Sequence, residues 1–140
     1  MDKIISPPRQ LRPTIFVVEE DNGARHCLTK NLRQFGYRLL VAADVEDALE
    51  WVSGNSYIHA DLLLLDLIGK LPIEALLIGR QLRAQARYHL ETPVVVMPEK
   101  VVKEEEGTDE NVSANDWICH YEDSDQLQRL LARLLESKVM

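Results

Sequence analysis

The chain has 140 residues, 46% of them apolar and 28% charged, a composition typical of one globular domain and not of a disordered chain. Its 16 Lys and Arg against 23 Asp and Glu give a net charge of −7, which argues against nucleic-acid binding and leaves cations and basic proteins as partners. The two cysteines, Cys27 and Cys119, form no CxxC motif, and no apolar run approaches the roughly 20 residues of a membrane span. We therefore expect one cytoplasmic domain without disulfides that binds neither nucleic acid nor membrane.

Residues 1–13 contain three prolines and scattered charges, which predicts a flexible N-terminal segment before a domain that spans residues 14–140. Within the domain, short runs that are apolar on both faces predict strands buried between two layers of helices. These runs are residues 14–18, 38–42, 61–65, 93–97 and, more weakly, 116–121.

Apolar residues at helical spacing separate these runs. The expected helices begin at an N-cap Asp21 or Asn22, at an N-cap Asp44, after Pro72, and behind Asp123 or Ser124. The segment 99–115 offers only Val101, Val102 and Val112 for burial, so we expect a short, loose or irregular element there. The alternation of strands and helices predicts an α/β fold, a three-layer doubly wound sandwich around a five-stranded parallel sheet.

Acidic residues follow two of the predicted strands. The first strand runs into Glu19 and Glu20, and the third ends in Asp66. Since the carboxyl ends of parallel strands meet at one edge of the sheet, these carboxylates are expected to converge there, where they would suit Mg²⁺. The alternative is that Glu19 and Glu20 are solvated acids before a helix N-terminus and that Asp66 caps a loop. Neither GxxxxGK[ST] nor GxGxxG occurs, which excludes the usual nucleotide-dependent chemistry.

Four segments of the sequence resemble two-component response-regulator receiver domains. The sequence TIFVVEEDN at 14–22 is similar to their first strand and acidic loop, and ADLLLLDL at 60–67 to their phosphoacceptor strand. TPVVVM at 92–97 and NDWICHY at 115–121 are similar to their fourth and fifth strands, at a spacing that fits. The resemblance implies the flavodoxin-like strand order 2-1-3-4-5.

The resemblance also implies roles for individual residues. Asp66 matches the aspartate that accepts phosphate from a histidine kinase, which makes it the phosphoacceptor. Glu19 and Glu20 match the acid pair that holds Mg²⁺ together with Asp66, and the backbone carbonyl of Ile68 matches the remaining protein ligand. Three clustered carboxylates repel one another, and the cation would offset that repulsion.

Other positions depart from the family pattern. Pro98 stands where receivers carry the Thr or Ser that binds the phosphoryl group, and it offers neither a hydroxyl nor an N–H. His120 replaces the Lys that pairs with the phosphoryl group, and Tyr121 replaces a proline whose peptide bond is usually cis, so a trans bond is expected there. Trp117 occupies the aromatic switch position without its hydroxyl partner. The sequence therefore resembles an atypical receiver whose acceptor is kept and whose switch residues are changed.

Two functions remain open at this stage. The first is a receiver phosphorylated at Asp66, with a histidine kinase or phosphotransfer protein as donor; the second is a pseudo-receiver that binds a protein without phosphorylation. Effectors would dock on the face formed by segment 99–115, the fifth strand and the last helix, and a homodimer is a further option. The acids from Glu104 to Glu110 lie in that segment and are either a solvated face or part of the docking surface. A phosphohydrolase is disfavoured because no general base or substrate loop follows Asp66, so we expect no enzyme.

Overall fold

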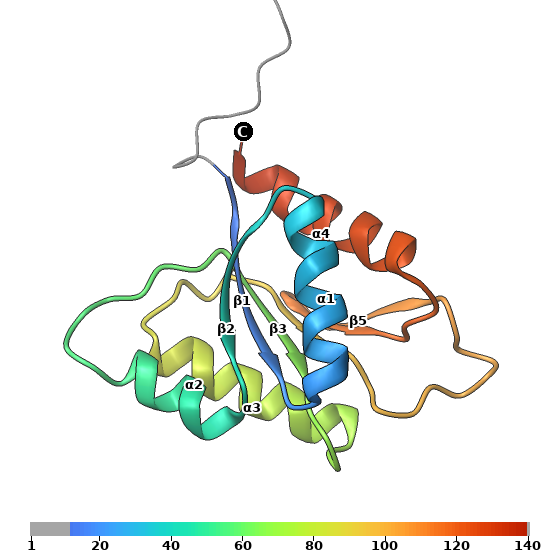
Figure 1. Ribbon diagram of the computed structural model, residues 1–140, viewed down its shortest axis with the longest axis horizontal. Helices are drawn as coiled ribbons and strands as arrows, with labels where there is room; N and C mark the ends of the chain where they lie inside the picture. Colours follow the sequence, from blue (N-terminus) through green and yellow to red (C-terminus); the bar gives the residue numbers. More distant parts are fainter. Residues whose placement is uncertain (1–11, 140) are drawn as a thin grey trace, which may run out of the picture.

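The computed structural model describes residues 12–139 of the chain, so all but the last two residues of the predicted N-terminal segment lie outside the described residues (Figure 1). The elements are β1 (Thr14–Glu19), α1 (Asn22–Gln34), β2 (Arg38–Ala42), α2 (Val45–Val52), β3 (Leu62–Asp66), α3 (Pro72–Gln85), β4 (Val94–Val96), β5 (Asp109–Ser113), β6 (Asp116–Cys119) and α4 (Ser124–Val139). None of the helices within residues 12–139 is both long and apolar enough to cross a membrane.

The strands form one sheet in the order β2-β1-β3-β4-β6-β5. The first five pair in parallel and keep the predicted order, with β6 as the fifth parallel strand. The prediction of a purely parallel, five-stranded sheet was incomplete, because β5 adds a sixth strand that pairs antiparallel with β6. The α/β class and the doubly wound architecture are confirmed.

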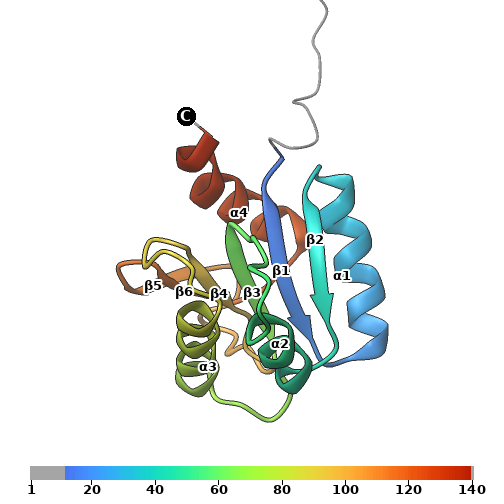
Figure 2. The same ribbon diagram turned by 90° about the vertical axis from the view of Figure 1, so that its left-hand side faces the viewer.

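Helices cover both faces of the sheet, and Figure 2 shows α1 on one side and α2 and α3 on the other. The strand residues alternate between two core clusters: Leu63 and Leu65 pack toward α2 and α3, and Leu62 and Leu64 toward α1 and α4. All four leucines are fully buried, and each contributes about 1.5–3 kcal/mol of hydrophobic stabilisation. Because helices cover both faces of the sheet, its strands need apolar residues at every position.

The two N-caps expected from the sequence orient the helices that follow β1 and β2. The Asp21 carboxylate accepts a hydrogen bond from the backbone N–H of Ala24 at 2.9 Å, and Asp44 accepts one from Asp47 at 2.8 Å. An N-cap of this kind contributes about 1 kcal/mol. The Asp21 cap begins α1 directly behind the end of β1, so the helix starts at the carboxyl edge of the sheet.

The segment between β4 and β6 contains no helix. Residues 103–107 form turns, Gly107 adopts a φ of +86° that favours glycine, and β5 then pairs with β6. The backbone N–H of His120 donates to the carbonyl of Thr108 at 2.9 Å, and the N–H of Gly107 donates to the carbonyl of His120 at 2.8 Å. The expectation of an irregular element with little to bury is confirmed for the turns, whereas β5 was not anticipated.

A buried ion-pair cluster fastens β6 to α3. Asp116 is 3% exposed, and its two carboxylate oxygens accept from Arg80 Nε at 2.7 Å and from Arg83 Nη1 at 3.1 Å. The same nitrogen of Arg83 donates to the carbonyl of Thr92 at 3.0 Å. Although burial alone would raise it, the pKa of Asp116 is lowered, because hydrogen bonds from Ser113 and Arg80 and the charges of both arginines favour the carboxylate.

Candidate functional site

Two acids meet at the carboxyl edge of the sheet. Glu19 and Asp66 are the last residues of β1 and β3, and their Cα atoms are register partners in this parallel pair. The backbone N–H of Glu20 continues the ladder to the Asp66 carbonyl at 3.3 Å. Because Cβ atoms at paired positions of neighbouring strands point to the same face, the two carboxyl groups lie side by side.

The carboxyl groups of Glu19 and Asp66 interact, which raises the pKa of Glu19 and opposes the rise in the pKa of Asp66. The pKa of Glu19 is raised to about 8, chiefly by burial and then by the hydrogen bond to Asp66 and the Asp66 charge. The pKa of Asp66 is also raised, chiefly by burial, although the hydrogen bond from Glu19 opposes this. Two carboxyl groups this close cannot both ionise at low cost.

Glu20 lies beside this pair but is engaged with the loop after β3. Its Oε1 accepts from the backbone N–H of Ile68 at 2.6 Å, and Glu99 Oε1 accepts from the N–H of Gly69 at 2.9 Å. Carboxylates from the β1 and β4 ends thus hold the β3–α3 loop against the carboxyl edge. Of the four predicted metal ligands, the structure brings Glu19 and Asp66 together and places Glu20 and Ile68 in contact with each other.

An open cavity of about 520 Å³ surrounds these acids, and we call it the acid pocket. It is lined by Glu19, Asp21, Ala24, Asp66, Ile68, Met97, Pro98, Glu99, Val101, Glu106 and Tyr121. Five of these residues are acidic, and no Lys, Arg or His is among them. Arg25 lies nearby and donates through Nε to the backbone carbonyl of Glu19 at 2.9 Å. The lining therefore carries uncompensated negative charge.

The predicted switch positions lie in three different surroundings. Pro98 lines the acid pocket, where it presents only ring carbons. Trp117 packs into the core beside α4, with the Arg133 guanidinium 5.2 Å above its ring. Tyr121 lines the acid pocket, and the peptide bond before it is trans, as are the other peptide bonds of residues 12–139.

His120 faces the β5 hairpin. Its ring is buried, with Nε2 3.1 Å from Glu110 Oε1 and Nδ1 3.9 Å from Glu105 Oε1. The ligand atoms of these three residues lie within 4.8 Å of one another. Nε2 is therefore hydrogen-bonded to Glu110, whereas Glu105 is too far from Nδ1 for a hydrogen bond. Of His120 and Tyr121, only Tyr121 lines the acid pocket.

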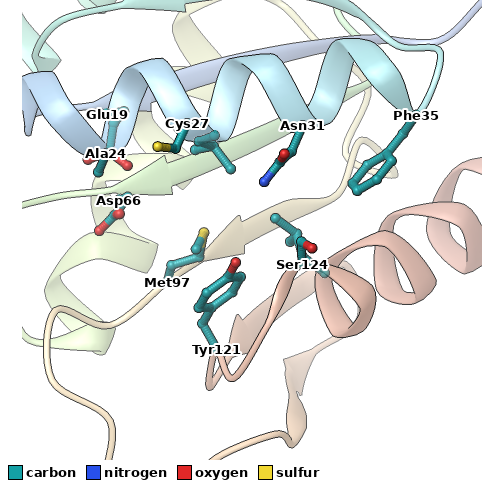
Figure 3. A pocket seen from close by; sticks show the side chains of 11 residues that line it. Glu19, Ala24, Cys27, Asn31, Phe35, Asp66, Met97, Tyr121 and Ser124 are labelled. Carbon is teal, nitrogen blue, oxygen red and sulfur yellow. The ribbon is translucent and has the colours of Figure 1, made fainter.

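A second cavity, which the sequence did not predict, continues from the acid pocket between α1 and α4 (Figure 3). We call it the α1–α4 groove; its volume is about 210 Å³. It is lined by Glu19, Ala24, Cys27, Leu28, Asn31, Phe35, Asp66, Met97, Tyr121, Ser124 and Leu127. Most of these residues lie on α1 and α4, and the spacing of the two helices creates the space.

Comparison with known proteins supports the fold. No protein-family model and no curated protein sequence matches the chain. Among solved structures, the chemotaxis protein CheY4 of Vibrio cholerae is 20% identical, with a TM-score of 0.64 over 89% of this chain and 99% of that chain. The receiver domain of a sensor histidine kinase from Pseudomonas aeruginosa PAO1, solved with a magnesium ion coordinated in its active site cleft, is 22% identical, with a TM-score of 0.58 over 89% of this chain and 98% of that one.

A response regulator from Thermotoga maritima is similar to the same extent, at 20% identity and a TM-score of 0.61 over 89% of this chain and 98% of that chain. All of these neighbours are response regulators or receiver domains, and the five parallel strands of this chain have the order that the sequence resemblance implied. The chain therefore has the fold of response-regulator receiver domains.

Proposed function

We propose that the chain is a cytoplasmic signalling module of the receiver type that acts by contact with other proteins and not as a metabolic enzyme, and that it does so without phosphorylation. The observation that carries this proposal is the chemistry of the acid pocket: Asp66 is kept, but Pro98 offers no hydroxyl, and His120 does not line the pocket and is hydrogen-bonded to Glu110. A phosphoryl group on Asp66 would add negative charge beside Glu19, Asp21 and Glu99, and no basic residue of the lining would offset it.

A second candidate, a receiver phosphorylated at Asp66, is favoured by the oxygen ligands at the carboxyl edge. Glu19, Asp66 and the backbone carbonyl of Ile68, with Glu20 beside them, are the hard oxygen donors that Mg²⁺ prefers, so the residues fit the ion. When bound, Mg²⁺ would neutralise developing negative charge on a phosphoryl group. Glu19 would give up its proton, and Glu20 would hold the Ile68 backbone in place through its 2.6 Å hydrogen bond.

The proposed docking face consists of the turn at 103–107, β5 and α4. Glu104, Glu105 and Glu106 in the turn and Glu110 on β5 are exposed. Such a face suits a partner with a basic surface, because complementary charge speeds encounter and excludes acidic partners. An effector protein is the expected occupant, and a histidine kinase or phosphotransfer protein would be a further partner only if Asp66 is phosphorylated.

Exposure to Mg²⁺ with acetyl phosphate or beryllofluoride tests the two candidates. Intact mass reports an adduct, and Trp117 fluorescence in a Trp51→Phe background reports a change near β6. The proposal expects no Asp66-dependent adduct and no spectral change. An adduct with a spectral change that Asp66→Asn abolishes would establish the phosphorylated receiver instead.

A variant that restores the two missing switch residues tests the same proposal through a gain of response. Pro98→Thr combined with His120→Lys returns a hydroxyl and a cation to the two switch positions. If their loss is what disables the pocket, the double variant gains an Asp66-dependent beryllofluoride response that the parent protein lacks. The matched control is Ser113→Thr with Arg129→Lys, which makes changes of similar size outside the pocket.

A further inference from the structure

The α1–α4 groove and the acid pocket form one continuous cavity. Five residues line both of them, namely Glu19, Ala24, Asp66, Met97 and Tyr121. The acid pocket supplies the wide mouth of about 520 Å³, and the groove supplies the narrower arm of about 210 Å³ that runs along α1. Small-molecule sites in proteins have volumes of this order, about 300–1,000 Å³.

The arm is mainly apolar. Leu28 and Leu127 form buried walls from α1 and α4, and Phe35 closes the far end as a half-buried ring. Figure 3 shows Asn31 and Phe35 extending from α1 toward the space in front of α4, with Met97 and Tyr121 on the other side. Such a lining, with a few polar groups among apolar ones, is typical of ligand sites.

The end of the arm at the carboxyl edge is acidic. The carboxyl groups of Glu19, which is 2% exposed, and Asp66 line the cavity there. The eleven residues that line the arm contain no Lys, Arg or His. The cavity therefore joins an apolar channel to a buried anionic end, and its charge is complementary to a cation with an apolar body.

We propose that this cavity binds a small amphipathic cation, an organic ammonium whose charged head lies against Glu19 and Asp66 and whose apolar body lies along the groove. From Ala24 to Asn31, α1 rises about 10 Å. An unbranched chain of about eight carbons has a similar length, because each C–C bond of about 1.5 Å advances an extended chain by slightly less than its length. The proposal concerns the unphosphorylated Asp66 carboxylate and does not rest on the proposed function.

The position of the head group has a consequence for the metal. An ammonium group and a divalent cation would use the same two carboxylates, so each must weaken the binding of the other by the same factor. Binding of such a ligand would therefore depend on whether a metal ion occupies Glu19 and Asp66. A purely apolar ligand would leave the carboxylates free and would not compete.

Cys27 provides a direct readout. It is exposed and lines the groove, whereas the second cysteine, Cys119, is buried. The experiment measures how fast an aromatic disulfide reagent modifies Cys27 in the whole chain with rising concentrations of octylammonium, octanoate or octanol, and Cys27→Ser identifies the reacting thiol. We expect octylammonium to slow the reaction at concentrations about tenfold lower than octanoate does, as one charge-assisted hydrogen bond would give. Added Mg²⁺ should reverse the protection by octylammonium and leave that by octanol unchanged.

Two variants separate the head group from the groove. Asp66→Asn should weaken protection by octylammonium about tenfold and leave protection by octanol unchanged. The control Glu46→Gln removes an exposed acid from α2, on the other face of the sheet, and should change neither. Equal protection by octanoate and octylammonium, protection that survives Asp66→Asn, or none with any of the three probes would each overturn the proposal.

Discussion

Two buried carboxyl sites in the same sheet are built in opposite ways. At the start of β6, Asp116 is surrounded by Arg80, Arg83 and Ser113, and its pKa is lowered. At the ends of β1 and β3, Glu19 accepts from the backbone N–H of Asp21 at 3.2 Å, but no basic side chain lines the pocket of Glu19 and Asp66, and the pKa values of both are raised. The charge of Asp116 is thus compensated by side chains of this chain, whereas that of the Glu19–Asp66 pair is not.

This difference distinguishes an acid that stabilises the fold from acids that are available to bind a cation. Asp116 has both oxygens occupied by arginines of α3, so its charge serves to attach the antiparallel hairpin to the helix layer. The Glu19–Asp66 pair instead holds a proton that a cation could replace, in a cavity open to solvent. An acid without a basic partner at the carboxyl edge of an α/β sheet is a candidate for a binding site.

Removing a partner from the completed site should have the largest effect. Arg83→Met keeps the apolar stem but leaves Asp116 with one arginine and the Thr92 carbonyl without its donor. We expect a loss of about 3–5 kcal/mol in the free energy of unfolding, because the buried Asp116 charge is then only partly compensated and the Thr92 carbonyl loses its donor. Urea unfolding followed by circular dichroism measures it.

The matched control is Arg129→Met, an exposed position on α4, which should change the free energy of unfolding by less than about 0.5 kcal/mol. A loss below about 1 kcal/mol for Arg83→Met would mean that Arg80 alone compensates Asp116, and the contrast between the two sites would then rest on the acid pocket alone.

The incomplete site should make stability depend on pH, with a smaller effect because solvent reaches the pair. The folded-state pKa of Glu19, about 8, exceeds the usual value of 4.5, so between these pH values the folded chain holds a proton that the unfolded chain has lost. The Glu19 contribution is therefore fully present below about pH 4.5 and is lost as the pH rises through about 8. Urea unfolding at several pH values measures the slope.

Asp66→Asn tests whether Glu19, and not another titrating group, causes the dependence of stability on pH. It removes the neighbouring charge that helps to raise the pKa of Glu19, so the slope between these pH values should become shallower. Saturating Mg²⁺ should flatten the slope of the unchanged protein by stabilising both carboxylates. A slope that neither change affects would show that other residues cause the pH dependence.

Much of the fold followed from local pattern. Runs such as Leu62 to Leu65, apolar at every position, are explained only by a sheet covered on both faces, and the caps Asp21 and Asp44 fix where two helices begin. The meeting of Glu19 and Asp66 followed from one topological rule about parallel strands. These features depend on residues near in sequence or on a general property of the fold.

The remainder depended on contacts between distant residues. The strand β5 has an acidic sequence without strand periodicity, and it forms because β6 offers an open edge to pair with. Asp116 is paired with arginines more than 30 positions earlier, which no spacing rule connects. The α1–α4 groove depends on how two helices lie on the sheet, and a sequence pattern gives their faces but not the gap between them.

Substitution of His120 has the smallest expected effect on stability, and it tests whether this side chain belongs to the hairpin or to the acid pocket. The sequence places it where receivers carry a lysine, but the side chain faces Glu110 on the hairpin at 3.1 Å. His120→Gln should lower the free energy of unfolding by no more than about 1 kcal/mol, since Gln can still bond an exposed carboxylate. Because the ring does not line the acid pocket, the Mg²⁺ affinity, measured by calorimetry, should be unchanged. A severalfold change in the Mg²⁺ affinity would show that His120 acts on the acid pocket. Faster hydrogen exchange confined to β5 and β6 would instead show that His120 stabilises the hairpin, since local opening is governed by local contacts.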